Sequence, residues 1–121
     1  MAKSILIVDD EPMICEILQD LLEDEGYNVS TCNDAIAASK ELNDAHYDLA
    51  MMDVYLSSNA DGLKLAEYIH THHNDVGVIP MTGYASASDI DTSCLSESYT
   101  CISKPFDLMD VIKAVATVIN E

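Results

Sequence analysis

Positively charged side chains are scarce in this chain of 121 residues. Five Lys and Arg residues stand against 22 Asp and Glu residues, which gives a formal net charge of −17 at pH 7. A charge of this size repels nucleic-acid phosphates and anionic lipid surfaces. We therefore expect no direct binding to nucleic acid or to membranes. Most of the acids are expected only to keep the surface soluble.

Long hydrophobic runs are also missing. A membrane span needs about 20 consecutive apolar residues, whereas the first apolar run, residues 5–8, ends in a cluster of acids. Such a run is neither a secretory signal nor a membrane anchor, so we expect a cytoplasmic protein. No linker rich in Pro, Gly or Ser and no internal repeat divides the chain. We interpret residues 1–121 as a single domain.

The cysteines of the chain form no Cys-x-x-Cys pair. They are Cys15, Cys32, Cys94 and Cys101, and two of them lie in apolar, strand-like segments. We therefore expect reduced, mostly buried thiols. Disulfide bonds or a zinc site are the less favoured alternatives.

Short apolar runs alternate along the chain with segments of helical periodicity. The runs are typical of strands that are buried on both faces of a sheet. The expected strands are residues 5–8, 27–32, 49–52, 76–82 and 99–103, and the expected helices include 12–25, 34–42, 62–73 and a last one from about residue 107. The Ser- and Asp-rich segment 85–96 is a poor helix by propensity, and we expect it to be mobile.

Alternating strands and helices predict an α/β fold. We expect one doubly wound, five-stranded parallel sheet with five helices, of the flavodoxin-like (βα)5 class. In such a sheet the carboxyl ends of the strands form one edge, where ligands bind. The polar residues that follow the strands at this edge are Asp9, Asp10, Asp53, Thr82 and Lys104. Carboxylates, a hydroxyl and an ammonium together suit a hard cation such as Mg²⁺ and a phosphoryl group.

Four short motifs at this edge resemble those of the receiver domains of two-component response regulators, the CheY-like family. They are VDD, MMD, TG and KPF, after the first, third, fourth and fifth strands, and the resemblance covers essentially the whole chain. It implies that Asp53 accepts a phosphoryl group from a histidine of a sensor kinase or of a phosphotransfer protein. The phosphorylated chain would then bind a further, unidentified protein. Because no output domain follows, we expect a stand-alone relay or partner-binding protein.

The resemblance also implies roles for the residues around the acceptor. Asp9 and Asp10 would hold Mg²⁺, together with the acceptor's own carboxylate and the backbone carbonyl of Tyr55. Lys104 would pair with the phosphoryl oxygens, and Thr82 would offer them its hydroxyl. A domain of this kind is not an enzyme in the ordinary sense, because it catalyses only its own phosphorylation and dephosphorylation.

Two positions depart from the family pattern. Ser57 stands four residues after Asp53, where many receivers have proline. Cys101 stands three residues before Lys104, where the family usually has an aromatic residue that rotates on activation. A cysteine has no large ring to bury, so we expect the switch to depend on Thr82 and the loop after it.

Other interpretations of the same residues predict different behaviour. A degenerate receiver would act as an interaction module without phosphorylation, and this alternative stays open. A haloacid-dehalogenase-like phosphohydrolase would need Asp-x-Asp after its first strand, whereas this chain has Asp9, Asp10 and Glu11 in succession. His70 and His73 have the spacing of a transition-metal pair on a helix, although an exposed polar helix end is the favoured interpretation.

Overall fold

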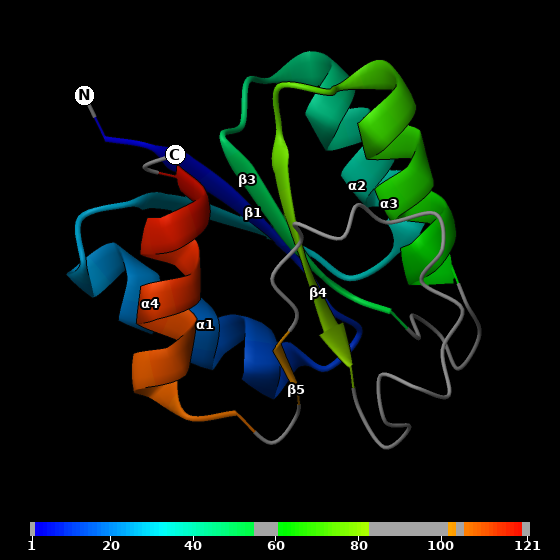
Figure 1. Cartoon of the computed structure of the whole chain (residues 1–121). Helices are drawn as coiled ribbons and strands as arrows, with labels where there is room; N and C mark the ends of the chain where they lie inside the picture. Colours follow the sequence, from blue (N-terminus) through cyan, green and yellow to red (C-terminus); the bar gives the residue numbers. More distant parts are fainter. Residues whose placement is uncertain (1, 55–60, 83–101, 104–105, 120–121) are drawn as a thin grey trace.

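The backbone alternates between strands and helices in the computed structural model, which describes residues 2–54, 61–82, 102–103 and 106–119. The strands are β1 (Ser4–Val8), β2 (Asn28–Cys32), β3 (Leu49–Asp53), β4 (Gly77–Thr82) and β5 (Ile102–Ser103). The helices within the described ranges are α1 (Pro12–Asp24), α2 (Ala35–Asp44), α3 (Asp61–His72) and α4 (Leu108–Ile119). All strands are parallel and form one sheet in the order β2-β1-β3-β4-β5 (Figure 1).

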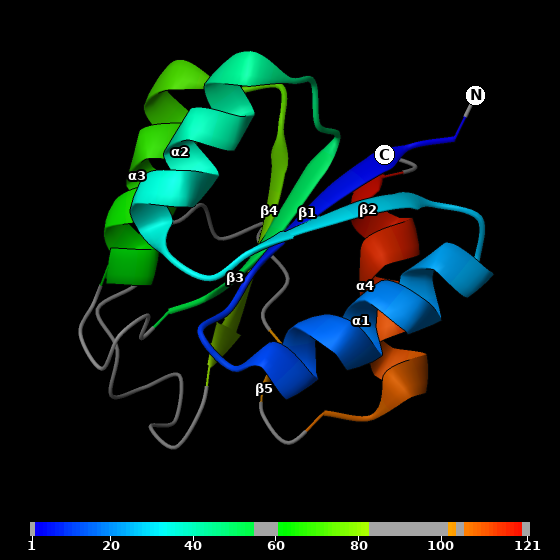
Figure 2. The same cartoon turned by 180° about the vertical axis from the view of Figure 1, so that it is seen from behind.

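Each face of the sheet is covered by a pair of helices. Figures 1 and 2 show α2 with α3 on one side of the sheet and α1 with α4 on the other. Successive side chains of a strand point to opposite faces, so Ile5 and Ile7 pack toward α1 and α4, whereas Leu6 and Val8 pack toward α2 and α3. Burial on both faces explains why β1 is an unbroken apolar run rather than an alternating one.

Local chemistry sets the ends of the helices. Pro12 lies in the first turn of α1, where its missing N–H leaves no hydrogen bond unmade. At the start of α2, the carboxylate of Asp34 accepts a hydrogen bond from the N–H of Ala37 at 2.7 Å, which satisfies one of the free donors of the first turn. Gly26 has a φ of +98° in the turn between α1 and β2, a conformation that glycine adopts without steric cost.

The prediction of a doubly wound parallel α/β sheet is confirmed, and each expected strand overlaps one that the structure contains. The strand ends differ slightly, since β2 begins at Asn28 and β3 extends to Asp53. The fifth helix expected before β5 falls outside the described residues, as do segment 85–96, Tyr55, Ser57, Cys94, Cys101 and Lys104. Within the described ranges, no helix has the length and the apolar composition needed to cross a bilayer.

Candidate functional site

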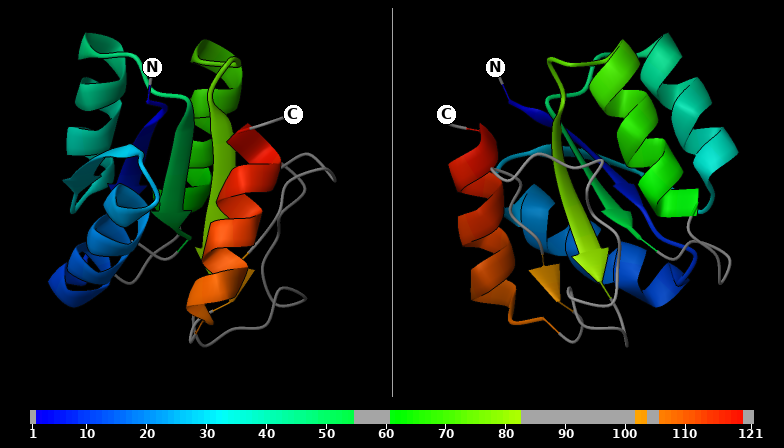
Figure 3. Two further views of the ribbon diagram at one scale, coloured as in Figure 1. Left: turned by 90° about the vertical axis from the view of Figure 1, so that its left-hand side faces the viewer. Right: turned by 45° about the vertical axis from the view of Figure 1, so that its right-hand side comes forward.

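The strands of the sheet run in the same direction, so that their carboxyl ends lie at one edge (Figure 3). Four carboxylates gather at this edge. Asp53 is the last residue of β3, and Asp9, Asp10 and Glu11 follow β1 in the turn that leads to α1. Because β1 and β3 are adjacent and parallel, the residues at their carboxyl ends meet at the same edge. Oxygen atoms of the four carboxylates lie within 4.8 Å of one another. We call these residues the acid cluster.

Half of the acid cluster is buried. Asp9 is 0% exposed and Asp53 is 6% exposed, whereas Asp10 and Glu11 reach the solvent. At a separation like the 4.8 Å found here, two unit charges repel by about 1 kcal/mol in water and by about 3 kcal/mol near a protein surface. A hard divalent cation offsets this repulsion and takes oxygen ligands. The donor set therefore fits Mg²⁺.

Asp9 is held by hydrogen bonds to its backbone and to its carboxylate. Its backbone N–H donates to the carbonyl oxygen of Cys32 at 3.1 Å, which extends the pairing of β1 with β2 by one residue. The Oδ1 atom of Asp9 accepts from the backbone N–H of Glu11 at 2.9 Å, and its carbonyl oxygen accepts from the thiol of Cys15 at 3.4 Å. The direction of this carboxylate is therefore set before any ligand binds.

Asp53 lies in the centre of the sheet. Every residue of β3 is buried, and the strand is paired with β1 on one side and β4 on the other. Asp53 is level with Met81 of β4, and the next N–H along the chain, that of Val54, donates to the carbonyl oxygen of Met81 at 2.9 Å. Pairing on both sides makes the end of β3 a rigid support for a reactive carboxylate.

The other predicted site residues lie at the same edge or outside the described residues. Thr82 is the last residue of β4 and pairs with Ser103 of β5. The backbone of Thr82 therefore lies at the edge of the sheet that carries the acid cluster. Lys104 comes directly after Ser103 in the sequence, and both Lys104 and Tyr55 lie outside the described residues. Their predicted roles stay predictions.

Glu11 is the member of the acid cluster that the sequence analysis did not assign to the metal site. It is the N-cap residue of α1, and its side chain makes no capping hydrogen bond there. Its backbone N–H reaches back to Asp9, which turns Glu11 toward the other acids. Its position directly after Asp10 in the sequence was the available indication.

Cys15 and Cys32, the cysteines that the structure describes, are not joined to any other cysteine by a disulfide bond. They line a cavity of about 470 Å³ beside Asp9, with Cys15 buried and Cys32 half-buried. Burial, and then the negative charge of Glu41, raises the pKa of the Cys32 thiol. For these two residues the structure agrees with the prediction of reduced thiols.

Comparison with known proteins identifies the family of this chain. The sequence pattern of the response regulator receiver domain matches residues 5–116. The chain belongs to this family. The receiver domain is 37% identical over 108 residues to the nitrogen assimilation regulatory protein NtrX of Azorhizobium caulinodans, covering 88% of this chain and 24% of that protein. It is also 36% identical over 117 residues to the sensor histidine kinase RcsC of Escherichia coli, covering 97% of this chain and 12% of the relative.

Solved structures share the fold of this receiver domain. The signal receiver domain of an HD domain-containing protein from Pseudomonas fluorescens matches with a TM-score of 0.89 at 27% identity, covering 99% of this chain and 96% of that one. A CheY-like receiver domain from Methanospirillum hungatei matches with a TM-score of 0.88 at 28% identity, covering 99% and 95%. The prediction of a CheY-like receiver domain is therefore confirmed. The chain spans about a quarter of the length of NtrX and about an eighth of the length of RcsC.

Proposed function

We propose that this receiver domain takes a phosphoryl group onto Asp53 in a Mg²⁺-dependent transfer from a phosphohistidine, and that the modification changes its binding to a partner protein. The observation that carries the proposal is the position of Asp53, buried at the end of the central strand and within 4.8 Å of the other members of the acid cluster. A metal ion bound by the acid cluster would place positive charge next to this carboxylate, and the rigid strand β3 holds the carboxylate in place.

The transfer would exchange one bond to phosphorus for another. A carboxylate oxygen of Asp53 attacks the phosphorus atom, the bond from phosphorus to the imidazole nitrogen breaks, and the histidine of the donor leaves with the bonding electron pair. Bound Mg²⁺ would neutralise the negative charge that is spread over the phosphoryl oxygens in the transition state. Asp9 and Asp10 would hold this ion with the acceptor's carboxylate and the Tyr55 carbonyl, and Glu11 extends the same donor set.

Two further residues complete the proposed chemistry. Lys104 pairs with the phosphoryl oxygens, which places a fixed positive charge next to the acceptor once it is modified. Thr82 donates its hydroxyl to the same group, and this contact links the modification to the end of β4. Turnover is limited to the chain's own phosphorylation and dephosphorylation, because the proposed site transfers the group to a residue of the chain itself.

The proposed phosphoryl donor is a sensor histidine kinase or a histidine phosphotransfer protein, which acts on this domain in the cytoplasm. The names of the relatives support this class of partner, since RcsC is a sensor histidine kinase and NtrX is a nitrogen assimilation regulatory protein. The excess of acids over bases disfavours direct contact with nucleic acid, so a protein target is proposed downstream.

Mass spectrometry of the intact protein tests the proposal. Wild type incubated with Mg²⁺ and acetyl phosphate should gain the mass of one phosphoryl group, and should gain none when a chelator removes the metal. Asp53→Asn should abolish the adduct and keep the fold, because the amide has the shape of the carboxylate but is not a nucleophile. Asp48→Asn is the matched control. Asp48 directly precedes β3, whereas Asp53 is the last residue of this strand, so the Asp48→Asn variant should still be labelled.

Each alternative has its own outcome in this experiment. Wild type that stays unlabelled with every small phosphoryl donor would favour the degenerate interaction module. Continuous release of inorganic phosphate at many equivalents per minute would favour a hydrolase. Undiminished labelling of Asp53→Asn would show that the acceptor has been assigned to the wrong residue.

A further inference from the structure

Gly62, the second residue of α3, lies directly against the backbone of the proposed acceptor. A Cβ atom at this position would lie 2.0 Å from the carbonyl oxygen of Asp53 and 2.7 Å from both the Cα and the carbonyl oxygen of Val54. The N–H of Gly62 also donates a hydrogen bond to that Val54 oxygen at 3.1 Å. The first turn of α3 therefore rests on the end of β3 through a contact that only glycine permits.

A larger residue at position 62 has no simple way to fit. The atoms that its Cβ would meet all belong to the backbone, so no change of side-chain rotamer makes room. The end of β3 is paired with β4, because Val54 donates to the carbonyl oxygen of Met81 at 2.9 Å. A side chain at position 62 must therefore move either the start of α3 or the peptide that carries Asp53.

We infer that Gly62 is a positioning residue for phosphoryl transfer: its lack of a side chain sets the orientation of the Asp53 peptide, and hence of the Asp53 carboxylate relative to Asp9 and Asp10. This inference rests on the proposed function, since it assumes that Asp53 is the acceptor. Displacing a reacting group by about 1 Å can slow a reaction about 100-fold. A substitution at position 62 should therefore slow transfer beyond what its effect on stability explains.

Two other glycines provide matched controls. A Cβ at Gly77 would lie 2.5 Å from the Cγ1 atom of Val118, so Gly77→Ala also overpacks the protein. Gly77 begins β4, however, at the edge of the sheet opposite the acid cluster. Gly26 has no atom within 4 Å of its Cβ position but has a φ of +98°, so Gly26→Ala strains the backbone without crowding a neighbour. Both variants lose stability for reasons unrelated to Asp53.

The experiment compares Gly62→Ala, Gly77→Ala, Gly26→Ala and wild type in three measurements. Urea unfolding reports stability, calorimetric titration reports the dissociation constant of Mg²⁺, and the time course of intact mass with acetyl phosphate reports the rate of transfer. The rate is measured at saturating Mg²⁺ and saturating donor, so that weaker binding of either one does not account for a slow reaction. A purely structural role for Gly62 would leave this saturated rate unchanged in the folded fraction.

Gly62→Ala should slow the saturated rate at least about tenfold, while Gly77→Ala and Gly26→Ala should stay within about twofold of wild type, although both also lose stability. A Gly62→Ala rate equal to that of the controls overturns the inference and leaves the proposed function intact. Wild type that takes up no phosphoryl group overturns the proposed function itself.

If Gly62→Ala is unfolded in buffer, the comparison is repeated in concentrated sucrose, which favours folded states. Failure to fold there, where Gly77→Ala folds, also overturns the inference, because Gly62 would then be required for the fold.

Discussion

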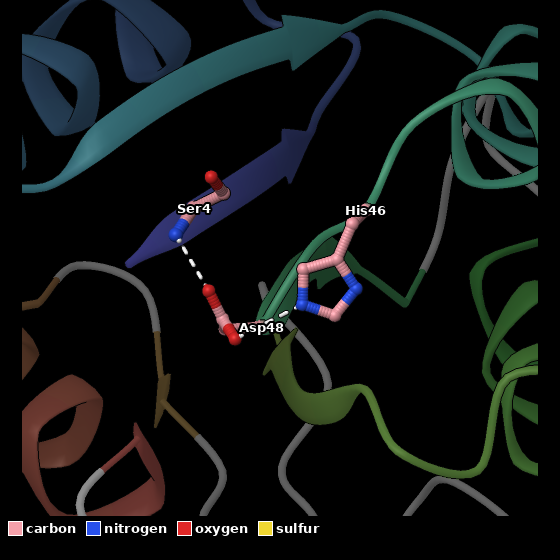
Figure 4. Close-up of polar contacts among 3 residues, drawn as sticks. All are labelled: Ser4, His46 and Asp48. Carbon is pink, nitrogen blue, oxygen red and sulfur yellow. Dashed lines mark hydrogen bonds and ion pairs between the residues drawn. The ribbon is translucent and has the colours of Figure 1, made fainter. Parts of the chain in front are cut away.

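The carboxylate of Asp48 accepts a hydrogen bond from the backbone N–H of Ser4 at 2.8 Å, across 44 positions of the sequence (Figure 4). The N–H of Asp48 donates to the carbonyl oxygen of Ser4 at 2.8 Å, and the carbonyl oxygen of Asp48 accepts from the N–H of Gly77 at 3.0 Å. Asp48 therefore ties together the amino ends of β1, β3 and β4. This connection lies at the edge of the sheet opposite the acid cluster.

Asp48→Asn should destabilise the protein, and the size of this loss should depend on pH. The hydrogen bond from Ser4 lowers the pKa of Asp48 below its ordinary value of 3.8. A lowered pKa contributes stability that is fully present above the unfolded-state pKa and is lost as the pH falls through the folded-state pKa. Urea unfolding should show a loss of about 1 kcal/mol at pH 7. The difference from wild type should shrink as the pH falls below about 4.

His46→Ala is the control for this prediction. The Nε2 atom of His46 lies 3.3 Å from the other carboxylate oxygen of Asp48, but 69% of the His46 side chain is exposed (Figure 4). An exposed pair of this kind contributes little, so this variant should change stability by less than about 0.5 kcal/mol. A gap between Asp48→Asn and wild type that widens in acid would contradict the assigned cause.

Asp10→Asn should stabilise the metal-free domain and weaken its binding of Mg²⁺. The substitution keeps the shape of the side chain and removes one charge from four carboxylates that lie within 4.8 Å of one another. Less repulsion in the absence of metal should raise the melting temperature by roughly 2–4 °C. Thermal unfolding followed by circular dichroism, with a chelator and then with Mg²⁺, measures both effects, and calorimetric titration should show affinity lower by about tenfold.

Asp20→Asn removes the same charge from an exposed position in the middle of α1, away from the acid cluster. Asp20→Asn should change the Mg²⁺ affinity and the melting temperature of the metal-free protein less than Asp10→Asn does. Glu11→Gln should behave like Asp10→Asn, because the structure includes Glu11 in the acid cluster. An equal rise in melting temperature for Asp20→Asn would mean that net charge, rather than local crowding, is the cause.

Cys32 should react with N-ethylmaleimide before Cys15 does in the folded protein. Both thiols line the same cavity, but Cys32 is half-buried, whereas Cys15 is only 9% exposed and donates its thiol hydrogen to Asp9. Labelling of Cys15 therefore requires local opening and should be at least about tenfold slower. Because the pKa of Cys32 is raised above 9.0, its own labelling should accelerate as the pH rises toward that value. Peptide mapping over time measures both rates, and equal rates at neutral pH would contradict the burial of Cys15.

Much of the site could be predicted because its parts are local in the sequence. An apolar run that ends in acids marks the carboxyl end of a buried strand, as in residues 5–11 and 49–53. In a parallel sheet, all such ends face one edge, so the meeting of Asp9, Asp10 and Asp53 follows from the fold class. The start of α1 at Pro12 and the cap of α2 at Asp34 were predictable for the same reason, since each residue acts within one turn of its own position.

The positions of the strands and helices, and which of them end in charge, can be predicted from the amino-acid sequence, because periodicity and capping act between residues a few positions apart. The contacts between groups far apart in the sequence become visible only in the folded protein. Examples are the Ser4 N–H on the Asp48 carboxylate and the inclusion of Glu11 in the acid cluster. Gly62 against the carbonyl of Asp53 is a third. No local pattern encodes these contacts, since they depend on the order and register of strands in the whole sheet and on how closely each helix packs against it.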